Sequence, residues 1–371
     1  MIERDELAGW LRLLETPQVG RESARRLLAA FGSAQAVFDA PMAARREVVA
    51  ATAAAALARP PAALDSLLST TLAWLHATDA PAPRHIITLG DPLYPPALLE
   101  TADPPLLLYA QGHVDLLQRP AVTLAVVGSR NPTRQGTDNA RAFAAHLSRA
   151  GLVVVSGLAT GIDAAAHEGA LDGPTGTIAV VGTGLDRVYP SRHLDLAHRI
   201  ACSGILLSEY SLGTPPLPAN FPLRNRIIAG LSRGTLVVEA ALQSGSLITA
   251  RLALEAGRDV FAIPGSIHSP QSRGCHTLIK QGAKLVDSAQ DILEEFGQAS
   301  PAAGVPESPG AAAGPADPLL EALGYDPVSL EALIARTGRS AADLNGSLLE
   351  LELDGRVARL PGQLFQRIAQ G

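Results

Sequence analysis

A short segment at residues 221–226, with the sequence FPLRNR, concentrates side chains that could bind a nucleic acid and runs into an expected helix at residues 227–231. Arg224 and Arg226 bracket an asparagine, and a phenylalanine begins the segment in a chain that is only 4% aromatic. A phosphate chain needs cations, and an unstacked base gains about 1 to 3 kcal/mol from an aromatic face. Together with Arg130, the segment predicts a basic strip suited to a single-stranded nucleic acid.

The same residues have a purely structural alternative. Arg224 or Arg226 could pair with a core carboxylate such as Asp163 or Glu239. Phe221 would then be a packing residue, and no basic strip would exist.

Five loops rich in glycine and other small residues follow apolar segments of the chain. They are residues 128–130, 156–163, 182–184, 244–246 and 264–266. Small residues let a phosphate approach the main chain, so the loops together predict a phosphate-binding cradle. A tight turn between a strand and a helix also needs glycine for steric reasons, so one such loop alone would be weak evidence.

Motifs for nucleotide cofactors and metals are missing from the sequence. No Gly-Lys-Ser/Thr P-loop is present, and the sequence after Gly182 reaches Arg187 where a dinucleotide fingerprint needs a third glycine. Cys202 and Cys275 lack metal-ligand spacing, and His167 is not followed by a second histidine one helical turn on. We therefore expect no cofactor and no metal.

Apolar segments alternate with helical segments from Thr123 onward. The expected strands are residues 124–127, 152–155, 177–181, 205–207, 235–238, 260–263 and 284–286. This alternation predicts an α/β fold, an extended Rossmann-like core whose parallel sheet is covered by helices on both faces. In such a sheet the ligand crevice lies beyond the carboxyl ends of the strands, where the glycine-rich loops fall.

Residues 1–78 predict a separate helical domain, because apolar residues recur there at three-to-four spacing without a convincing strand. Residues 16–20 (TPQVG) separate two helical segments, and Arg21, Arg25 and Arg26 follow. This arrangement resembles a helix-hairpin-helix or SAM-like unit, in which the glycine and the arginines could contact a phosphate. The alternative is a surface helix with solvated arginines.

Three more segments complete the expected organisation. Residues 79–297 form the core, and residues 298–316 are too poor in large apolar residues to fold, which predicts a flexible linker. Residues 317–371 contain three helical segments and then a hairpin, a pattern typical of a winged helix. Its third helix carries Glu350 and Glu352, so we expect a regulatory or protein-contact role rather than DNA reading.

The composition favours a soluble globular protein. Hydrophobic residues make up 47% of the chain, yet no apolar run approaches the roughly 20 residues that span a bilayer. The N-terminus lacks a signal segment, so we expect no membrane association and a cytoplasmic location. The net charge of −6 argues against non-specific coating of DNA, so any nucleic-acid site must be a local basic patch.

The core motifs closely resemble the DNA-processing protein A family, also called DprA or Smf. The matching stretches are residues 90–91 with 94–95, 103–105 with 108–109, 127–130, 156–163 with 167, 184–186 with 189–190, 208–209, 221–232, 238–240, 244–250 and 264–265. They cover nearly the whole core in the right order. The N-terminal hairpin and the winged helix are looser features of the family.

This resemblance implies that the chain binds and protects incoming single-stranded DNA and helps RecA assemble on it during natural transformation, without catalytic turnover. Carried over residue by residue, the family's DNA pocket falls on Gly128, Ser129, Arg130, Ser156, Gly157, Gly161, Phe221, Arg224, Asn225 and Arg226. Some members carry a basic residue shortly before the phenylalanine. This sequence has residues 218–220 (PAN) there, which puts the strength of the basic strip on that side in doubt.

The resemblance also implies a homodimer formed through the last part of the core. Leu278, Ile279 and Leu285 are our candidates for that surface, although a buried helix face explains them nearly as well. A role in general recombination or plasmid handling stays open beside natural transformation.

The strongest competing interpretation is an enzyme. The core also resembles the lysine-decarboxylase-like nucleotide phosphoribohydrolases, for which Glu239 and Asp163 would be the carboxylates. Their Pro-Gly-Gly-x-Gly-Thr signature is absent, and Glu239 has no neighbouring glutamate to complete an acid and base pair. A third class, a protein adaptor, would leave the arginines of the basic strip without a ligand.

Overall fold

The computed structural model describes residues 2–118, 122–297, 317–324 and 327–368. The chain divides into two compact units, Met1–Ser300 and Pro301–Gly371. The linker predicted at residues 298–316 lies outside the described residues. In the part that is described, no helix is long and apolar enough to cross a membrane.

The described N-terminal part of the first unit is helical, as the sequence predicted. Its helices are α1 (Arg4–Glu15), α2 (Arg21–Phe31), α3 (Ala34–Asp39), α4 (Met42–Val48), α5 (Ala51–Ala56) and α6 (Leu64–His76). Apolar residues at helical spacing, among them Leu7 and Leu27, pack with Trp74 in one buried cluster. Gln18 has a φ of 66° in the turn between α1 and α2, and Gly20 precedes α2. The turn therefore lies where the predicted hairpin placed it.

One nine-stranded sheet forms the described core, in the order β1-β2-β6-β5-β4-β3-β7-β8-β9. The strands are β1 (Arg84–Thr88), β2 (Leu107–Gly112), β3 (Thr123–Val127), β4 (Val153–Ser156), β5 (Thr177–Val180), β6 (Ile205–Ser208), β7 (Gly234–Val237), β8 (Asp259–Ala262) and β9 (Lys284–Leu285). In the part of the sheet ordered β6-β5-β4-β3-β7-β8-β9, every pair of neighbouring strands is parallel, so the predicted parallel core is confirmed.

Two antiparallel strands at one edge depart from the purely parallel sheet that the sequence predicted. β2 pairs antiparallel with both β1 and β6. It contains most of the apolar run at residues 106–109, and neither β1 nor β2 was among the strands expected from the sequence. β1 begins with the polar pair Arg84 and His85, and only Ile86 and Ile87 are apolar. Such a short pattern does not distinguish a strand from a loop.

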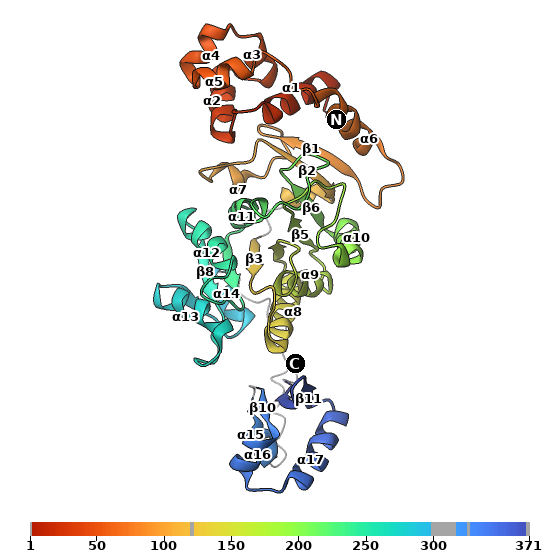
Figure 1. Cartoon of the computed structure of the whole chain (residues 1–371), viewed down its shortest axis with the longest axis vertical. Coiled ribbons are helices and arrows are strands. Elements are labelled where there is room, and N and C mark those ends of the chain that lie inside the picture. The colour runs from red at the N-terminus through yellow and green to blue at the C-terminus, as the bar shows by residue number, and fades with distance from the viewer. Residues whose placement is uncertain (1, 119–121, 298–316, 325–326, 369–371) are drawn as a thin grey trace. The chain divides into compact units, whose positions relative to one another are not determined.

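Helices cover both faces of the sheet (Figure 1). One face packs against α11 (Asn220–Leu231), α12 (Ser246–Glu255) and α13 (Arg273–Lys280), and the other against α8 (Arg134–Arg149), α9 (Ile162–Leu171) and α14 (Ala289–Glu295). Along β3, Ala125 and Val127 pack with the first group, whereas Leu124 and Val126 pack with the second. Burial on both faces explains why these strands are continuous apolar runs.

The strand order reverses at β3. From β3 the chain builds β4, β5 and β6 on one side of that strand and then returns to place β7, β8 and β9 on the other side. Loops that leave the carboxyl ends of β3 and β7 therefore lead in different directions and leave a crevice between them. The loops at residues 128–130 and 244–246 lie at this carboxyl end of the strands.

The described residues of the second unit form the helices and the hairpin of the predicted winged helix. Its elements are α15 (Pro318–Leu323), β10 (Val328–Ser329), α16 (Leu330–Thr337), α17 (Ala341–Leu353), β11 (Val357–Leu360) and β12 (Leu364–Arg367). The hairpin of β11 and β12 was expected, while the two-residue β10, which pairs with β12, was not. Ser329 and Ser340 cap the N-termini of α16 and α17 with their side chains, and Leu333, Leu344 and Phe365 form part of the core.

Candidate nucleic-acid interface

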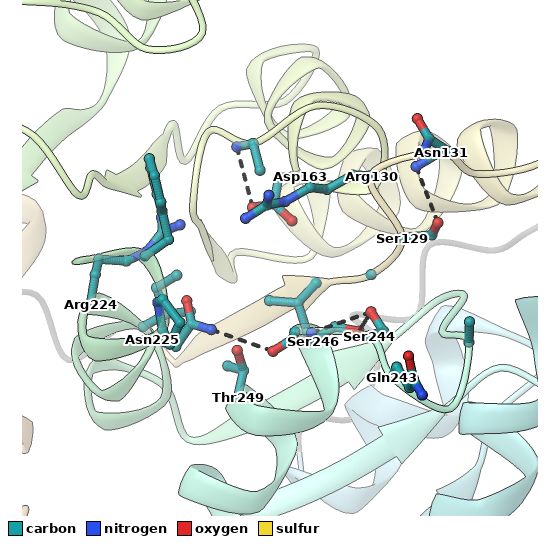
Figure 2. Close-up of a pocket in the computed structure, with 18 of the residues that line it drawn as sticks. Ser129, Arg130, Asn131, Asp163, Arg224, Asn225, Gln243, Ser244, Ser246 and Thr249 are labelled. Carbon is teal, nitrogen blue, oxygen red and sulfur yellow. Dashed lines mark hydrogen bonds between the residues drawn. The ribbon is translucent and has the colours of Figure 1, made fainter. Parts of the chain in front are cut away.

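A cavity of about 450 Å³ opens at the carboxyl ends of β3 and β7 (Figure 2). Its walls come from the loop after β3, from α11, and from the loop that leads from β7 into α12. It is lined by Val127, Gly128, Ser129, Arg130, Asn131, Ala159, Asp163, Phe221, Pro222, Arg224, Asn225, Ile228, Ala241, Gln243, Ser244, Gly245, Ser246, Thr249 and Gln271. The position agrees with the crevice expected where the strand order reverses.

The loop after β3 is held rigidly and presents Arg130 outward. Ile162 donates its backbone N–H to the Ser129 carbonyl at 3.1 Å, and the Thr160 hydroxyl donates to the Arg130 carbonyl at 3.1 Å. Gly161 has a φ of 84°, and a side chain there would collide with both carbonyls. The Arg130 side chain is exposed and makes no ion pair among the described residues. It is a free cation at the mouth of the cavity.

Arg224 lies in the cavity wall but is almost completely buried, with 4% of its surface exposed. Its Nη1 donates to the carbonyl of Gly157 at 2.6 Å and to the carbonyl of Val180. Burial lowers the pKa of Arg224 to about 10, with the charge of nearby Asp163 opposing the shift, so the group stays charged at neutral pH. Arg224 therefore ties α11 to the ends of β4 and β5 while its charge contributes to the potential in the cavity.

Asp163, at the start of α9, is the acidic group of the cavity. Its carboxylate accepts backbone N–H groups from Gly157 at 3.1 Å and from Ala159 at 3.3 Å. Burial raises the pKa of Asp163, and the charge of Arg224 and these two hydrogen bonds limit the rise. The carboxylate is thus committed to holding the loop after β4, and it does not pair directly with Arg130.

Arg226 lies outside the cavity, contrary to the expectation of one strip containing both arginines. Its Nε donates to Asp103 at 2.8 Å, and its Nη2 pairs with Glu209. We expected a helix from residue 227, but α11 begins at Asn220. Residues two apart on a helix point about 200° away from each other, so Arg224 and Arg226 cannot face the same side. The alternative of a carboxylate partner thus describes Arg226, although with different carboxylates from those considered.

The N-terminal helices contribute to the same ion-pair cluster. Asp103 also accepts hydrogen bonds from Arg21 at 2.9 Å and from Arg25, both on α2. Arg226 and Glu209 have only 12% and 7% of their side chains exposed. Two of the three arginines that followed the predicted hairpin are therefore paired with Asp103 rather than solvated.

Phe221 forms one side of the cavity mouth. Its ring packs over the backbone of Gly182, where an added Cβ would come within 3.1 Å of the ring. The Arg130 guanidinium carbon lies 5.8 Å from the ring centroid, and the Tyr189 ring lies 5.5 Å away between centroids. An aromatic group and a free cation are thus brought together, as the sequence predicted for these two residue types.

Ser156, Gly157 and Gly161 do not line the cavity. The Ser156 hydroxyl is fully buried and donates to the Val126 carbonyl at 2.7 Å, which links β4 to β3. Gly157 leaves the space that the Arg224 guanidinium fills. These three residues therefore support the loops around the cavity without lining it. The predicted site residues that do line it are Gly128, Ser129, Arg130, Phe221, Arg224 and Asn225.

Several lining residues were absent from the predicted site. Gln243, Ser244, Gly245, Ser246 and Thr249 come from the loop after β7 and the first turn of α12. The Asn225 amide donates to the Gly245 carbonyl at 3.4 Å, and the Ser244 and Ser246 hydroxyls lie 2.7 Å apart (Figure 2). The signal for them was the small-residue loop at residues 244–246. Asn131 and Gln271, which also line the cavity, had no comparable signal.

The groups considered for enzymatic chemistry have structural partners. Glu239 accepts a hydrogen bond from the backbone N–H of Thr133 at 2.9 Å and another from the Thr133 hydroxyl, at the start of α8. His167 is fully buried, and its Nδ1 contacts the Thr177 hydroxyl at 2.8 Å. Within the described ranges, no group of three or more histidine, cysteine or acidic side chains could hold a metal ion.

The three residues considered for a dimer surface differ in exposure. Leu278 is buried at 6% and packs in the main core cluster, Ile279 is half-buried, and Leu285 is 47% exposed. Leu278 also lines an apolar groove of about 450 Å³ between α12 and α13, together with Leu242 and Leu254. Burial in the core thus accounts for Leu278.

Fold and cavity together define a Rossmann-like α/β protein with a polar crevice at its topological switch point, extended by a helical hairpin unit and a winged helix. Three family models match the chain. They are DNA recombination-mediator protein A at residues 85–297, the DprA-like N-terminal HHH domain at residues 3–63 and the DprA winged helix domain at residues 301–363. The chain belongs to the DNA recombination-mediator protein A family and has a role in DNA processing and recombination.

Individual relatives agree with this assignment. Protein Smf of Escherichia coli K12 is 43% identical over 80% of this chain and 79% of its own length. The DNA processing protein DprA of Streptococcus pneumoniae is 53% identical over 56% of this chain and 72% of its own length.

Two solved structures of relatives have the same fold. The X-ray structure of S. pneumoniae DprA aligns with a TM-score of 0.67 and 38% identity, covering 79% of this chain and 98% of that one. The Helicobacter pylori protein, described for its unique single-stranded DNA binding mode, aligns with a TM-score of 0.53 and 32% identity over 57% of this chain and 95% of its own.

Proposed function

We propose that this chain binds single-stranded DNA in the crevice at the carboxyl ends of β3 and β7 and helps RecA assemble on it, without catalytic turnover. The observation that carries the proposal is the position of Arg130, an exposed and unpaired cation beside the ring of Phe221 at the mouth of the cavity. A cation next to an aromatic face is the arrangement that single-strand binding requires. The H. pylori relative described for single-stranded DNA binding supports it.

In this proposal the phosphate and the base bind in different parts of the crevice. Arg130 is the one exposed cation among the described lining residues, so it would bind a phosphate at the mouth with the help of the Ser129 loop. Apart from Arg130 and the buried residues Arg224 and Asp163, the lining is uncharged, and it includes the amides and the hydroxyl of Asn225, Gln243 and Thr249. Such groups match the polar edge of a base better than a phosphate.

The remaining predicted site residues act by positioning. Gly157 and Ser156 hold Arg224 and the loop after β4, and Gly161 holds the loop that carries Arg130. Arg226 is paired with Asp103 and Glu209, so it would affect DNA binding only by fixing the position of α11.

Absence of turnover is part of the proposal. Glu239 is bound at the start of α8, and Asp163 is held by two backbone N–H groups, so neither carboxylate is free to act as acid or base. Incubation of the chain with nucleoside monophosphates should release no free base. Release at a rate typical of enzymes would favour the phosphoribohydrolase interpretation instead.

Binding is tested by fluorescence anisotropy with a labelled oligothymidylate and a duplex of equal length. We expect tighter binding of the single strand, because a duplex keeps its bases stacked and cannot offer one to Phe221 or to the cavity. Equal affinity for both would count against a base-accepting crevice.

We also propose RecA and a second copy of this chain as partners in the cytoplasm, acting during natural transformation or general recombination. The exposed leucines of the groove between α12 and α13, Leu242 and Leu254, join Ile279 and Leu285 as candidates for the self-association surface, whereas Leu278 is packed in the core. The RecA role is tested by the lag in RecA ATPase activity on single strands coated with single-strand binding protein. The chain should shorten this lag, and an unchanged lag would contradict the role.

A further inference from the structure

Tyr189 is an exposed aromatic residue next to the proposed site, in the loop between β5 and α10 (Leu194–Ser203). Its surface is 49% exposed, although the chain buries most of its aromatic rings. The Tyr189 and Phe221 rings contact each other with centroids 5.5 Å apart and an angle of 35° between their planes. Tyr189 is not among the residues that line the cavity.

The loop that carries Tyr189 is anchored to the same set of loops as the crevice. The ring Nδ1 of His193 lies 3.0 Å from the carbonyl of Leu158, in the loop after β4. Tyr189 is therefore held close to the cavity while half of its surface stays open to solvent.

The surroundings of Phe221 leave little of its ring free. Gly182 lies beneath the ring, Arg130 lies 5.8 Å from its centroid, and Tyr189 covers a further part. A base that enters the cavity can use only the part of Phe221 that faces inward. A neighbouring base outside the cavity needs another aromatic surface, and the exposed Tyr189 ring supplies one.

We propose that Tyr189 is a second base-stacking residue, which binds the nucleotide adjacent to the one held in the cavity. This inference rests on the proposed single-strand function. Phe221 would lie between the two bases, with Arg130 on the phosphate that joins them. Stacking on an aromatic face does not depend on which base is present, so this second position should accept all four bases.

The test compares Tyr189→Leu with Tyr189→Phe in anisotropy titrations of oligothymidylate. Tyr189→Leu retains apolar contact with Phe221 but has no aromatic face, and it should weaken binding about tenfold. Tyr189→Phe retains the face and should bind within about twofold of the original chain, by the same argument. Because Tyr189 is half exposed, the melting temperature of both variants should stay unchanged.

A scan with single abasic sites along the oligonucleotide locates the contact. The original chain should show two adjacent positions where loss of the base weakens binding, and Tyr189→Leu should show only one. Original affinity in Tyr189→Leu, or two sensitive positions in that variant, would overturn the inference. An Arg130→Ala titration then separates the two proposals. Loss of binding in Arg130→Ala leaves the proposed function standing although the Tyr189 inference has failed. Unchanged binding in Arg130→Ala contradicts the proposed function itself.

Discussion

The guanidinium group of Arg224 fills the space above the Cα atom of Gly157, and no room is left between them for a side chain. Arg224 donates there to the Gly157 carbonyl at 2.6 Å, while the Gly157 N–H donates to Asp163. One glycine therefore brings together a buried cation and a buried anion from two different helices. The wall of the cavity depends on this contact between α11 and the loop after β4.

Gly157→Ala should displace Arg224 and damage both folding and binding. The buried charged group would lose hydrogen bonds worth about 1.5 to 3 kcal/mol each, so we expect a stability loss of about 2 to 4 kcal/mol. Urea unfolding followed by circular dichroism measures it. Gly245→Ala is the control for stability, because an added Cβ there has no atom within 4 Å. Equal stability of both variants would mean that Arg224 adapts freely.

Asp103→Asn should loosen the N-terminal helices from the core. Asp103 joins Arg21 and Arg25 of α2 to Arg226 of α11, and losing its charge leaves Arg226 with Glu209 alone. We expect a loss of about 2 kcal/mol, reduced from the value for a fully buried pair because Asp103 is partly exposed. Both tryptophans, at positions 10 and 74, belong to the N-terminal helices, so their fluorescence during urea unfolding reports on this part.

The matched control for that substitution is Asp172→Asn. Asp172 pairs with Arg141 in an exposed position, with 42% and 55% of the side chains accessible. Its loss should change stability by less than about 1 kcal/mol. A similar small effect in Asp103→Asn would show that the cluster does not hold the helices.

Salt dependence should reveal how many phosphates the crevice contacts. For single strands, the logarithm of the affinity falls with the logarithm of the salt concentration by about 0.7 for each neutralised phosphate. Arg130→Ala should therefore reduce the slope by about 0.7, since it removes one cation. Titrations at several sodium chloride concentrations give the slopes. An identical slope in the variant would mean that Arg130 binds no phosphate.

His167 should make folding sensitive to mild acid. The Thr177 hydroxyl donates to the Val154 carbonyl, so His167 Nδ1 must donate to Thr177, which leaves Nε2 buried without a partner. Burial lowers the pKa of His167 to about 3. The pKa in the folded state lies below the unfolded value of about 6.5, so the unfolded chain binds a proton at His167 before the folded chain does. The free energy of unfolding is therefore unaffected by His167 above pH 6.5 and decreases as the pH falls from 6.5 toward 3.

The expected loss from His167 between pH 7 and pH 5 is about 2 kcal/mol. It is measured as the difference in pH dependence between the original chain and His167→Gln. Asp163, whose raised pKa acts in the opposite direction, is present in both proteins and cancels in the comparison. Parallel pH profiles would show that His167 is accessible to protons in the folded chain.

The strands of the parallel core could be predicted from the sequence because each is buried on both faces. β4 and β7, for example, were expected at residues 152–155 and 235–238 and lie one residue away from those bounds. The edge strand β1 could not be predicted, since pairing with β2 stabilises a segment whose own pattern is half polar. Tertiary pairing, rather than local sequence, decides such an edge strand.

The candidate site was less predictable because residue type does not reveal what a residue faces. Gly157 and Gly182 were attributed to phosphate binding, yet they make room for Arg224 and Phe221. Arg224 and Arg226 looked equivalent in the sequence, but the unexpected early start of α11 turns them to opposite sides. Arg130 and Phe221 were placed together by the sequence argument and lie together in the fold.

The most direct test of the account is the affinity of Arg130→Ala for a single-stranded oligothymidylate, compared with Arg149→Ala. Arg149 is also exposed, but it ends α8, about 22 Å along the helix from its start near the crevice. We predict that Arg130→Ala weakens binding at least tenfold at an unchanged melting temperature, while Arg149→Ala binds like the original chain. Equal affinities of the two variants would contradict the claim that a single strand binds in this crevice.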